Sequence, residues 1–271
     1  MDKYLFMDLD DTIFQTLRKC KDAVPLSLAA ISRYGEPLSF MTERQRAFFA
    51  FLDAGAIIIP TTARNLDAFN RVSLTFRHCV ILNFGGVVLT PERTPDMDWL
   101  EKLKMKNQKT HQKLKDAFHA LLDFIEVDGL AASARLIGDF GLDFYIVVKN
   151  KGSEKGLLDH IYRNFFLKHN DEATYIHYND NNLCMLPRHL NKRYAVEYVI
   201  EKYIAPHQKP FLTIGMGDSA SDLDFMAVCD YMITPSRSQI RKITIDAALV
   251  KSRTSDGFVK RPQVKRANLE E

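Results

Sequence analysis

The stretch from Tyr4 to Phe14 constrains the fold more than any other part of the chain. It begins as an apolar run of strand type and ends abruptly in acidic and hydroxyl residues, namely Asp8, Asp10, Asp11 and Thr12. Carboxylates crowded at the carboxyl end of a buried strand repel one another unless a cation lies between them. Mg²⁺ prefers oxygen ligands, and open α/β sheets place ligand sites at this end of their strands. The stretch therefore indicates a metal-assisted site or, as the alternative, a solvated acidic turn after a strand.

Composition limits the class of protein. The 271 residues include 37 basic and 34 acidic side chains, and the net charge of +3 is too small to indicate a nucleic-acid partner. The cysteines have neither zinc-site spacing nor the pattern of a disulfide framework, since they lie far apart at Cys20, Cys79, Cys184 and Cys229. No apolar run approaches the roughly 20 residues that span a bilayer, and the N-terminus lacks the apolar core of a signal peptide. We expect a soluble cytoplasmic protein, a monomer or homodimer, with no membrane partner.

Strand-like and helix-like segments alternate over the first 86 residues. The spacing of apolar residues predicts a helix over 23–34, and a capping-box pattern at Thr42 predicts a second helix that Gly55 ends. Apolar runs at 56–60 and 79–82 predict buried strands, with a helix beginning near Asn65 between them. This alternation indicates a parallel sheet with helical crossovers.

The pattern changes after Gly86. Helical spacing extends over 96–127 with an interruption near Asn107, and a second helix is predicted over 153–168, where Ser153 would be its N-cap. Strands are predicted at 135–138, 142–148, 174–178 and 183–186. The short links between these strands predict an antiparallel α+β module, inserted between the two halves of the parallel domain.

The parallel pattern returns after Pro187. A helix is predicted over 191–204, a strand over 211–217, a short strand over 231–234 and a helix over 238–247. The chain from Lys251 onward is basic with little apolar patterning, which indicates a frayed end. We therefore divide the chain into a core domain, an inserted module and a tail: 1–86 with 188–250, 87–187, and 251–271.

Polar residues follow the predicted strands in a set order: Asp8-Leu9-Asp10-Asp11-Thr12, then Thr62-Ala63-Arg64, then Lys192, then Gly217 through Asp222. This order resembles the four motifs of the haloacid-dehalogenase superfamily of aspartate-nucleophile phosphatases. The inserted module is similar to the C2-type cap of that superfamily, and the layout is most similar to its Cof and sucrose-phosphatase-like group. The resemblance covers the chain except the tail. It implies an α/β fold, a Rossmann-like parallel-sheet core with an inserted α+β cap domain.

The chemistry of the two leading carboxylates can be argued from their positions. Asp8, at the strand end, is the best candidate nucleophile on phosphorus. Asp10 points to the same side if the chain stays extended, so it can protonate the leaving oxygen and later deprotonate the attacking water. A second Asp at this position argues against a dehalogenase.

The resemblance implies roles for the other motif residues. Thr62 would donate a hydrogen bond to a phosphate oxygen, and Lys192 would neutralise charge on Asp8 and the phosphate. Mg²⁺ would be held by Asp8, the backbone carbonyl of Asp10 and Asp218, with Asp222 binding it directly or through water. The alternatives from local structure are an N-cap role for Thr62 and a capping pair for Asp218 and Asp222.

Residues that could contact the substrate lie near the same strand ends and at turns of the inserted module, where a cap would set specificity. They are Thr12, Arg64, Asn83, Arg135, His177 and Asn179.

Three positions depart from the pattern of the resembled group. Asp11 and Ala63 stand where Gly is common, and Phe84 separates Asn83 from Gly85. None of these changes removes a catalytic atom.

The sequence therefore predicts a Mg²⁺-dependent phosphomonoester hydrolase that acts through an aspartyl-phosphate, on a sugar phosphate or a similar small metabolite. The alternatives are a phosphosugar mutase-like enzyme and a non-catalytic binding or regulatory protein on the same fold.

Overall fold

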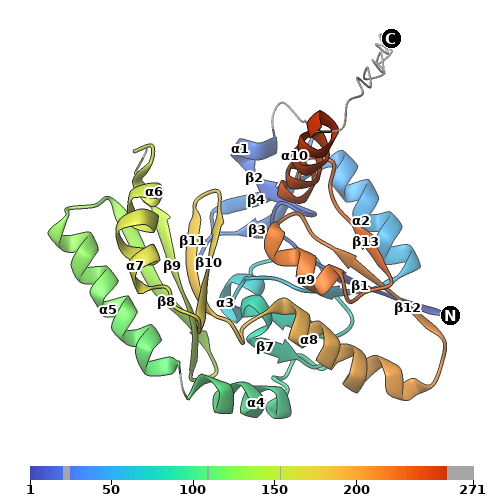
Figure 1. Cartoon of the computed structure of the whole chain (residues 1–271). Helices are drawn as coiled ribbons and strands as arrows, with labels where there is room; N and C mark the ends of the chain where they lie inside the picture. Colours follow the sequence, from blue (N-terminus) through green and yellow to red (C-terminus); the bar gives the residue numbers. More distant parts are fainter. Residues whose placement is uncertain (21–24, 109, 153, 255–271) are drawn as a thin grey trace, which may run out of the picture.

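A parallel sheet of four strands forms the centre of the larger part of the molecule (Figure 1). The computed structural model describes residues 1–20, 25–108, 110–152 and 154–254. The order of strands across the sheet is β13 (Tyr231–Ile233), β12 (Phe211–Met216), β1 (Asp2–Met7) and β5 (Ile57–Pro60). The predicted parallel α/β core is confirmed.

The two faces of this sheet are both buried, because side chains alternate along β1. Leu5 and Met7 pack against Leu52 of α2 (Glu43–Gly55) on one face. The Thr42 side chain accepts a hydrogen bond from the Gln45 backbone N–H at the start of α2, and Gln45 Oε1 accepts one from the Thr42 backbone N–H, which confirms the predicted capping box.

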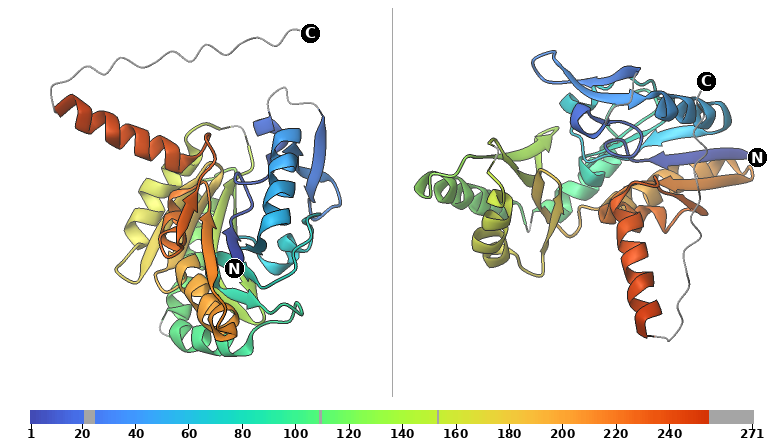
Figure 2. Two further views of the ribbon diagram at one scale, coloured as in Figure 1. Left: turned by 90° about the vertical axis from the view of Figure 1, so that its right-hand side faces the viewer. Right: turned by 90° about the horizontal axis from the view of Figure 1, so that it is seen from above.

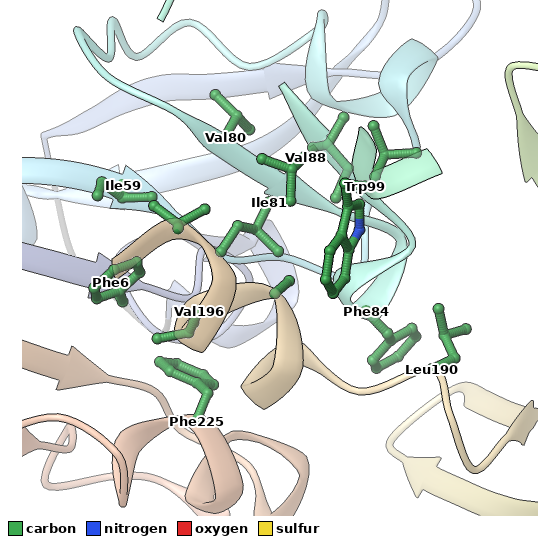
Figure 3. Close-up of a cluster of buried hydrophobic side chains, with 14 of the residues drawn as sticks. Phe6, Ile59, Val80, Ile81, Phe84, Val88, Trp99, Leu190, Val196 and Phe225 are labelled. Atoms are coloured by element: carbon green, nitrogen blue, oxygen red, sulfur yellow. The ribbon is translucent and has the colours of Figure 1, made fainter. Parts of the chain in front are cut away.

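The opposite face of the sheet is covered by helices from later in the chain. Phe6 and Ile59 pack against Val196 of α8 (Lys192–Val199) and Phe225 of α9 (Leu223–Met226) (Figure 3). Short helical turns η3 (Ile200–Ile204), η4 (Ala205–His207) and η5 (Ala220–Asp222) adjoin these helices.

The chain next to β5 extends this layer. Thr61 forms a parallel bridge with Ile81 of β6 (Val80–Leu82), which pairs with β7 (Val87–Leu89) antiparallel across η1 (Asn83–Gly85). The helix α3 (Leu66–Phe69) lies between β5 and β6 in the chain. The helix α4 (Met97–Asn107) lies within the predicted inserted module. Its Trp99 packs in the same apolar cluster as β6 and β7.

The inserted module is a four-stranded antiparallel sheet with helices on its outer face (Figures 1 and 2). We call this sheet the inserted sheet; its strand order is β10 (Thr174–Asn179), β11 (Asn182–Pro187), β9 (Leu142–Asn150) and β8 (Ala132–Asp139). The outer helices are α5 (His111–Val127), α6 (Leu157–Ile161), the π-helical turn η2 (Tyr162–Phe166) and α7 (Leu167–His169). The predicted strands and the predicted helix break near Asn107 are confirmed, whereas Ser153 lies outside the described residues.

The predicted helix over 23–34 is wrong. Residues 23 and 24 lie outside the described part of the chain, and β3 (Leu26–Ile31) follows as a strand. It pairs with β4 (Pro37–Thr42), which also pairs with β2 (Gln15–Thr16), just before α1 (Leu17–Cys20). Pairing with a distant strand supplies hydrogen bonds that local apolar spacing does not reveal.

The last described element, α10 (Gln239–Thr254), projects from the body of the molecule (Figure 2). It contains the predicted helix 238–247 except its first residue, and it extends into the predicted tail; residues 255–271 lie outside the described part. Over the described residues, no helix has both the length and the apolar character needed to cross a bilayer.

Candidate active site

Lys192 stands at the centre of a buried group of charges. Its Nζ donates one hydrogen bond of 2.7 Å to Asp8 Oδ1 and another of 2.7 Å to Asp222 Oδ1. Burial by itself would lower the pKa of Lys192, but the two carboxylates raise it above its ordinary value. Asn191 starts α8 by accepting a hydrogen bond from the Arg193 backbone N–H, which places Lys192 in the first turn of the helix. The ammonium therefore stays protonated between the two carboxylates.

Three carboxylates, those of Asp8, Asp218 and Asp222, have oxygen atoms within 4.8 Å of one another. All three side chains are buried. Burial raises the pKa of Asp8 although Lys192 opposes the rise, and burial together with the charge of Asp8 raises the pKa of Asp218. Lys192 alone therefore does not balance the negative charge of this group.

The donor set fits a divalent cation with a preference for oxygen ligands. Carboxylate oxygens that are buried, close together and incompletely neutralised are the ligands that Mg²⁺ takes in proteins. Asp8 and Asp218 would hold it, since Asp222 Oδ1 binds Lys192 and Asp222 Oδ2 already accepts three hydrogen bonds. Thr12 lies between Asp8 and Asp218, because its Oγ1 is 3.0 Å from Asp8 Oδ2 and 3.4 Å from Asp218 Oδ1.

The loop after β12 holds Asp222 in place through a close backbone approach. Asp222 Oδ2 accepts hydrogen bonds from the backbone N–H groups of Asp218 (3.2 Å) and Ser219 (3.0 Å) and from the Ser219 hydroxyl (2.7 Å). A Cβ added to Gly217 would lie 2.4 Å from Asp222 Cβ. Glycine is therefore required at this position. Asp222 is also part of a capping box with Ser219, so the capping alternative holds for Asp222 and is compatible with its contact to Lys192, whereas Asp218 is buried and makes no such cap.

Asp10 lies beside this group but faces a different partner. Both of its carboxylate oxygens accept hydrogen bonds from Arg64, at 2.7 Å from Nε and 2.8 Å from the second nitrogen. Asp11, the next residue, has a φ of 61°, a left-handed conformation that Gly adopts more easily. Asp11 tolerates it, and its carboxylate forms an ion pair of 2.7 Å with Lys19 of α1.

Thr62 follows β5 and is buried, and its hydroxyl oxygen accepts a hydrogen bond of 3.2 Å from the Arg64 backbone N–H. Its own hydroxyl proton has no acceptor among the described residues. The N-cap of α3 is Asn65, whose side chain accepts a hydrogen bond from the Ala68 backbone N–H. The alternative that Thr62 caps this helix is therefore wrong.

The predicted contacts of the inserted module divide into two groups. His177 on β10 packs its ring 5.5 Å from that of Phe84, and burial, followed by the charge of Lys192, lowers the pKa of His177 to about 4. Its imidazole is therefore neutral and close to the catalytic candidates. Arg135 is exposed and lies on β8, the opposite edge strand, in the same row of paired residues as His177, whereas Asn179 lies at the end of β10.

Asn83 contacts the inserted sheet instead of the carboxylate group. Its Nδ2 donates a hydrogen bond of 2.6 Å to Asp139 Oδ2, and that same oxygen accepts one from the Leu66 backbone N–H at 2.8 Å. The Oδ1 atom of Asn83 is buried without a hydrogen-bond partner in the described structure. Asn83 thus joins the core to the inserted sheet.

Two further contacts between these parts involve residues that the sequence analysis did not single out for this role. Asp180, in the turn between β10 and β11, forms ion pairs with Arg18 (2.6 Å) and Lys19 (3.0 Å) of α1. The Tyr145 hydroxyl donates a hydrogen bond of 2.9 Å to the Ala63 carbonyl. Each contact joins residues more than 80 positions apart in the chain, so no local pattern predicts it.

Comparison with solved structures shows a shared fold. The structure of sucrose-phosphatase from Synechocystis, in complex with sucrose and phosphate, matches with a TM-score of 0.52 and 14% identity, covering 91% of this chain and 88% of that one. The C-terminal domain of trehalose-6-phosphate phosphatase from C. albicans matches with a TM-score of 0.52 and 12% identity, covering 97% of this chain and 79% of that one. No family model and no curated protein matches the sequence. The chain therefore has the fold of these two phosphatases, the fold that its four motifs predict.

Proposed function

We propose that the protein is a phosphomonoester hydrolase with Asp8 as its nucleophile. The observation that carries this proposal is the setting of the Asp8 carboxylate. Lys192 donates a hydrogen bond to one of its oxygens, and Thr12 donates one to the other. The Thr12 hydroxyl also lies next to Asp218. Two fixed donors orient the Asp8 carboxylate. Its negative charge is unfavourable in the buried surroundings and would be shared with the phosphoryl group during attack.

In the first half of the reaction, an Asp8 oxygen attacks phosphorus and the phosphorus–oxygen bond to the leaving group breaks. Asp10 gives its proton to the leaving oxygen, so the products are an alcohol and an aspartyl-phosphate. Lys192 and the Thr62 hydroxyl face the charge that develops on the phosphoryl oxygens. Asp10 must give up part of its contact with Arg64 to carry this proton, because Arg64 binds both of its oxygens.

In the second half, water attacks the phosphorus of the aspartyl-phosphate. Asp10 takes a proton from that water, the bond between phosphorus and Asp8 breaks, and inorganic phosphate leaves. The Asp8 carboxylate and the protonated Asp10 are thereby restored.

Mg²⁺ is the proposed cofactor, held by Asp8, Asp218 and the backbone carbonyl of Asp10, with Asp222 fixed beside it by Lys192. When bound, it would supply positive charge to the phosphoryl oxygens and reduce the repulsion between the carboxylates. Asp218 is assigned to the cation because its oxygen lies within 4.8 Å of those of Asp8 and Asp222 and, unlike them, has no ion pair with Lys192.

The proposed substrate is a small phosphate ester, with sugar phosphates as the first class to test. The two proteins that share the fold are named sucrose-phosphatase and trehalose-6-phosphate phosphatase. The inserted sheet would act as the cap that contacts the leaving alcohol, since its His177 packs against Phe84 and is close enough to Lys192 for that charge to lower the pKa of His177.

The test is phosphate release from p-nitrophenyl phosphate and a panel of sugar and polyol phosphates, with Mg²⁺ or with a chelator. We expect turnover that needs Mg²⁺ and falls to background in Asp8→Asn. Quenching a reaction with ³²P-labelled substrate should leave label on the wild-type chain and none on Asp8→Asn.

The matched control is Asp67→Asn, the same change at a carboxylate that is 73% exposed and pairs only with Arg71 among the described residues. It should retain wild-type turnover. An Asp8→Asn protein that remained as active as Asp67→Asn would exclude Asp8 as the nucleophile, and a wild type inactive on every ester with Mg²⁺ would contradict the proposed function.

A further inference from the structure

The inserted sheet turns one of its two faces toward the candidate active site. Side chains alternate along β9, so Tyr145 and Val147 pack in the core cluster while Ile146 and Val148 pack under the outer helices. Lys149 continues the first series and therefore lies on the face toward the core. Lys149 is the next-to-last residue of β9, so it lies at the end of that strand.

Arg135 lies on the same face, in the neighbouring strand. The register pairs Arg135 with Val147 and Ser133 with Lys149, so Arg135 and Lys149 lie on adjacent strands two positions apart. Diagonal neighbours at this spacing are within reach of long side chains. The charge of Arg135 lowers the pKa of Lys149, after the larger effect of burial, and Asp10 and Arg64 of the core also act on it. The two cations therefore share the sheet face that contacts the core at Ala63, between Thr62 and Arg64, through the Tyr145 hydroxyl.

The carboxylates of Asp10 and Asp139 bind partners other than these two cations. Asp10 binds Arg64 through both oxygens, and Asp139 binds Asn83 and the Leu66 backbone N–H. Among the described residues, neither Arg135 nor Lys149 has an ion-pair or hydrogen-bond partner for its charged group. Lys149 is only partly exposed, so water compensates its charge incompletely, and Arg135 adds repulsion.

We propose that Arg135 and Lys149 form a subsite for a second anionic group of the substrate, a carboxylate or a further phosphate, carried by the part that leaves as the alcohol. This inference rests on the proposed function and narrows its substrate class to phosphate esters with an acidic leaving group. An anion between the two cations would remove their repulsion and provide charge-assisted hydrogen bonds. A substrate with an uncharged leaving group would leave both cations unpaired.

The test compares matched pairs of esters that differ only in the second anion. For a carboxylate the pair is 3-phosphoglycerate against glycerol 3-phosphate, and for a phosphate it is fructose 1,6-bisphosphate against fructose 6-phosphate. Wild-type kcat/KM should favour the member that carries the second anion, called the anionic member below, in at least one pair. The expected preference is roughly tenfold to a hundredfold, the range for a hydrogen bond between charged groups. The pair that shows the preference identifies the anion.

The variants Lys149→Met and Arg135→Gln should each abolish most of that preference, measured as the ratio of kcat/KM for the two members of a pair. Lys168→Met, which removes an exposed lysine on the outer helix α7, is the matched control and should keep the preference.

A binding measurement separates this inference from the proposed function. Calorimetry on Asp8→Asn, which cannot form the aspartyl-phosphate, should show tighter binding of the anionic member, and adding Lys149→Met should remove the difference. Equal affinity for both members of both pairs would overturn the subsite whether or not the wild type is a phosphatase. Tighter binding of the anionic member by a wild type that hydrolyses no ester would support the subsite and contradict the phosphatase.

Discussion

Arg64 binds both carboxylate oxygens of Asp10, at 2.7 and 2.8 Å, and its guanidinium lies 5.2 Å from the centre of the Phe14 ring. Arg64 also donates a hydrogen bond to the Ala68 carbonyl, so its position is set from three sides. The Asp10 side chain is thereby held at the edge of the buried acidic group. A proton carrier in this position has to exchange partners during each catalytic cycle.

The first prediction concerns the proton that Asp10 is proposed to transfer. Asp10→Asn should lower kcat on sugar and polyol phosphates by about 10²- to 10⁴-fold, the usual contribution of a positioned general acid. The first-turnover rate on p-nitrophenyl phosphate should fall much less, because p-nitrophenolate leaves without being protonated and is released before the attack of water that also uses Asp10. Rapid-quench measurement of the first turnover on both substrate types checks this. An equal loss on both would show that Asp10 does not act on the leaving group.

The second prediction concerns the cation. Asp218→Asn removes a buried charge that Asp8 and Asp222 repel, so the metal-free variant should have a higher Tm than the metal-free wild type. Mg²⁺ should raise the Tm of the wild type, because it binds only the folded protein, and should have little effect on the variant. Thermal unfolding with and without Mg²⁺ tests both parts. A Tm shift of the same size in the two proteins would place the cation elsewhere.

The third prediction is a loss of stability in acid that originates at His177. Burial, and then Lys192, hold the pKa of His177 at about 4 in the folded protein, against 6.5 ordinarily. Below about pH 6.5 the unfolded chain therefore binds a proton that the folded protein does not, and the free energy of unfolding decreases until the pH falls to about 4. At pH 5 this loss amounts to about 2 kcal/mol.

Urea unfolding at pH 7 and pH 5 measures this loss. His177→Gln should lose about 2 kcal/mol less than the wild type between the two pH values. The same substitution at the exposed His119 should leave the wild-type difference unchanged. If His177→Gln and His119→Gln behaved alike, the acid sensitivity would belong to other groups.

The fourth prediction concerns Lys19, which joins the loop after the nucleophile to the inserted sheet through Asp11 and Asp180. Its side chain is 30% exposed, so Lys19→Met should change the free energy of unfolding by less than about 1 kcal/mol. The KM should rise severalfold, because the inserted sheet loses a contact that positions it over the site. An unchanged KM would show that the other contacts position the sheet without Lys19.

The fifth prediction is that Gly217→Ala inactivates the enzyme. The added methyl group would meet Asp222 Cβ at 2.4 Å, which displaces the carboxylate that binds Lys192. The free energy of unfolding should fall by roughly 1–3 kcal/mol, the usual cost of overpacking. Gly55→Ala, at a glycine with nothing within 4 Å of the added group, is the matched control and should remain active.

The sequence alone predicted the elements whose signals are local. The Thr42 capping box, the helix break near Asn107 and the strands of the inserted sheet depend on residues close together in the chain, and all are present. The segment at 26–31 was predicted incorrectly because its apolar residues fit a helix by spacing, whereas pairing with β4 makes it a strand.

The candidate site shows the same division. The order of acidic, hydroxyl and basic residues at strand ends was sufficient to predict that Asp8, Lys192, Asp218 and Asp222 lie together, because parallel strands bring their carboxyl ends to one edge. It did not reveal that Arg64 binds Asp10, that Asn83 binds Asp139, or that Lys149 faces the core.

Sequence by itself thus determined the parallel core, the inserted antiparallel sheet and the membership of the acidic group. Only the tertiary structure decided which charge pairs with which and which residues of the inserted sheet face the site. The physical reason is range. Backbone hydrogen bonding and side-chain alternation act over a few residues, whereas an ion pair depends on the relative placement of modules that are far apart in the chain.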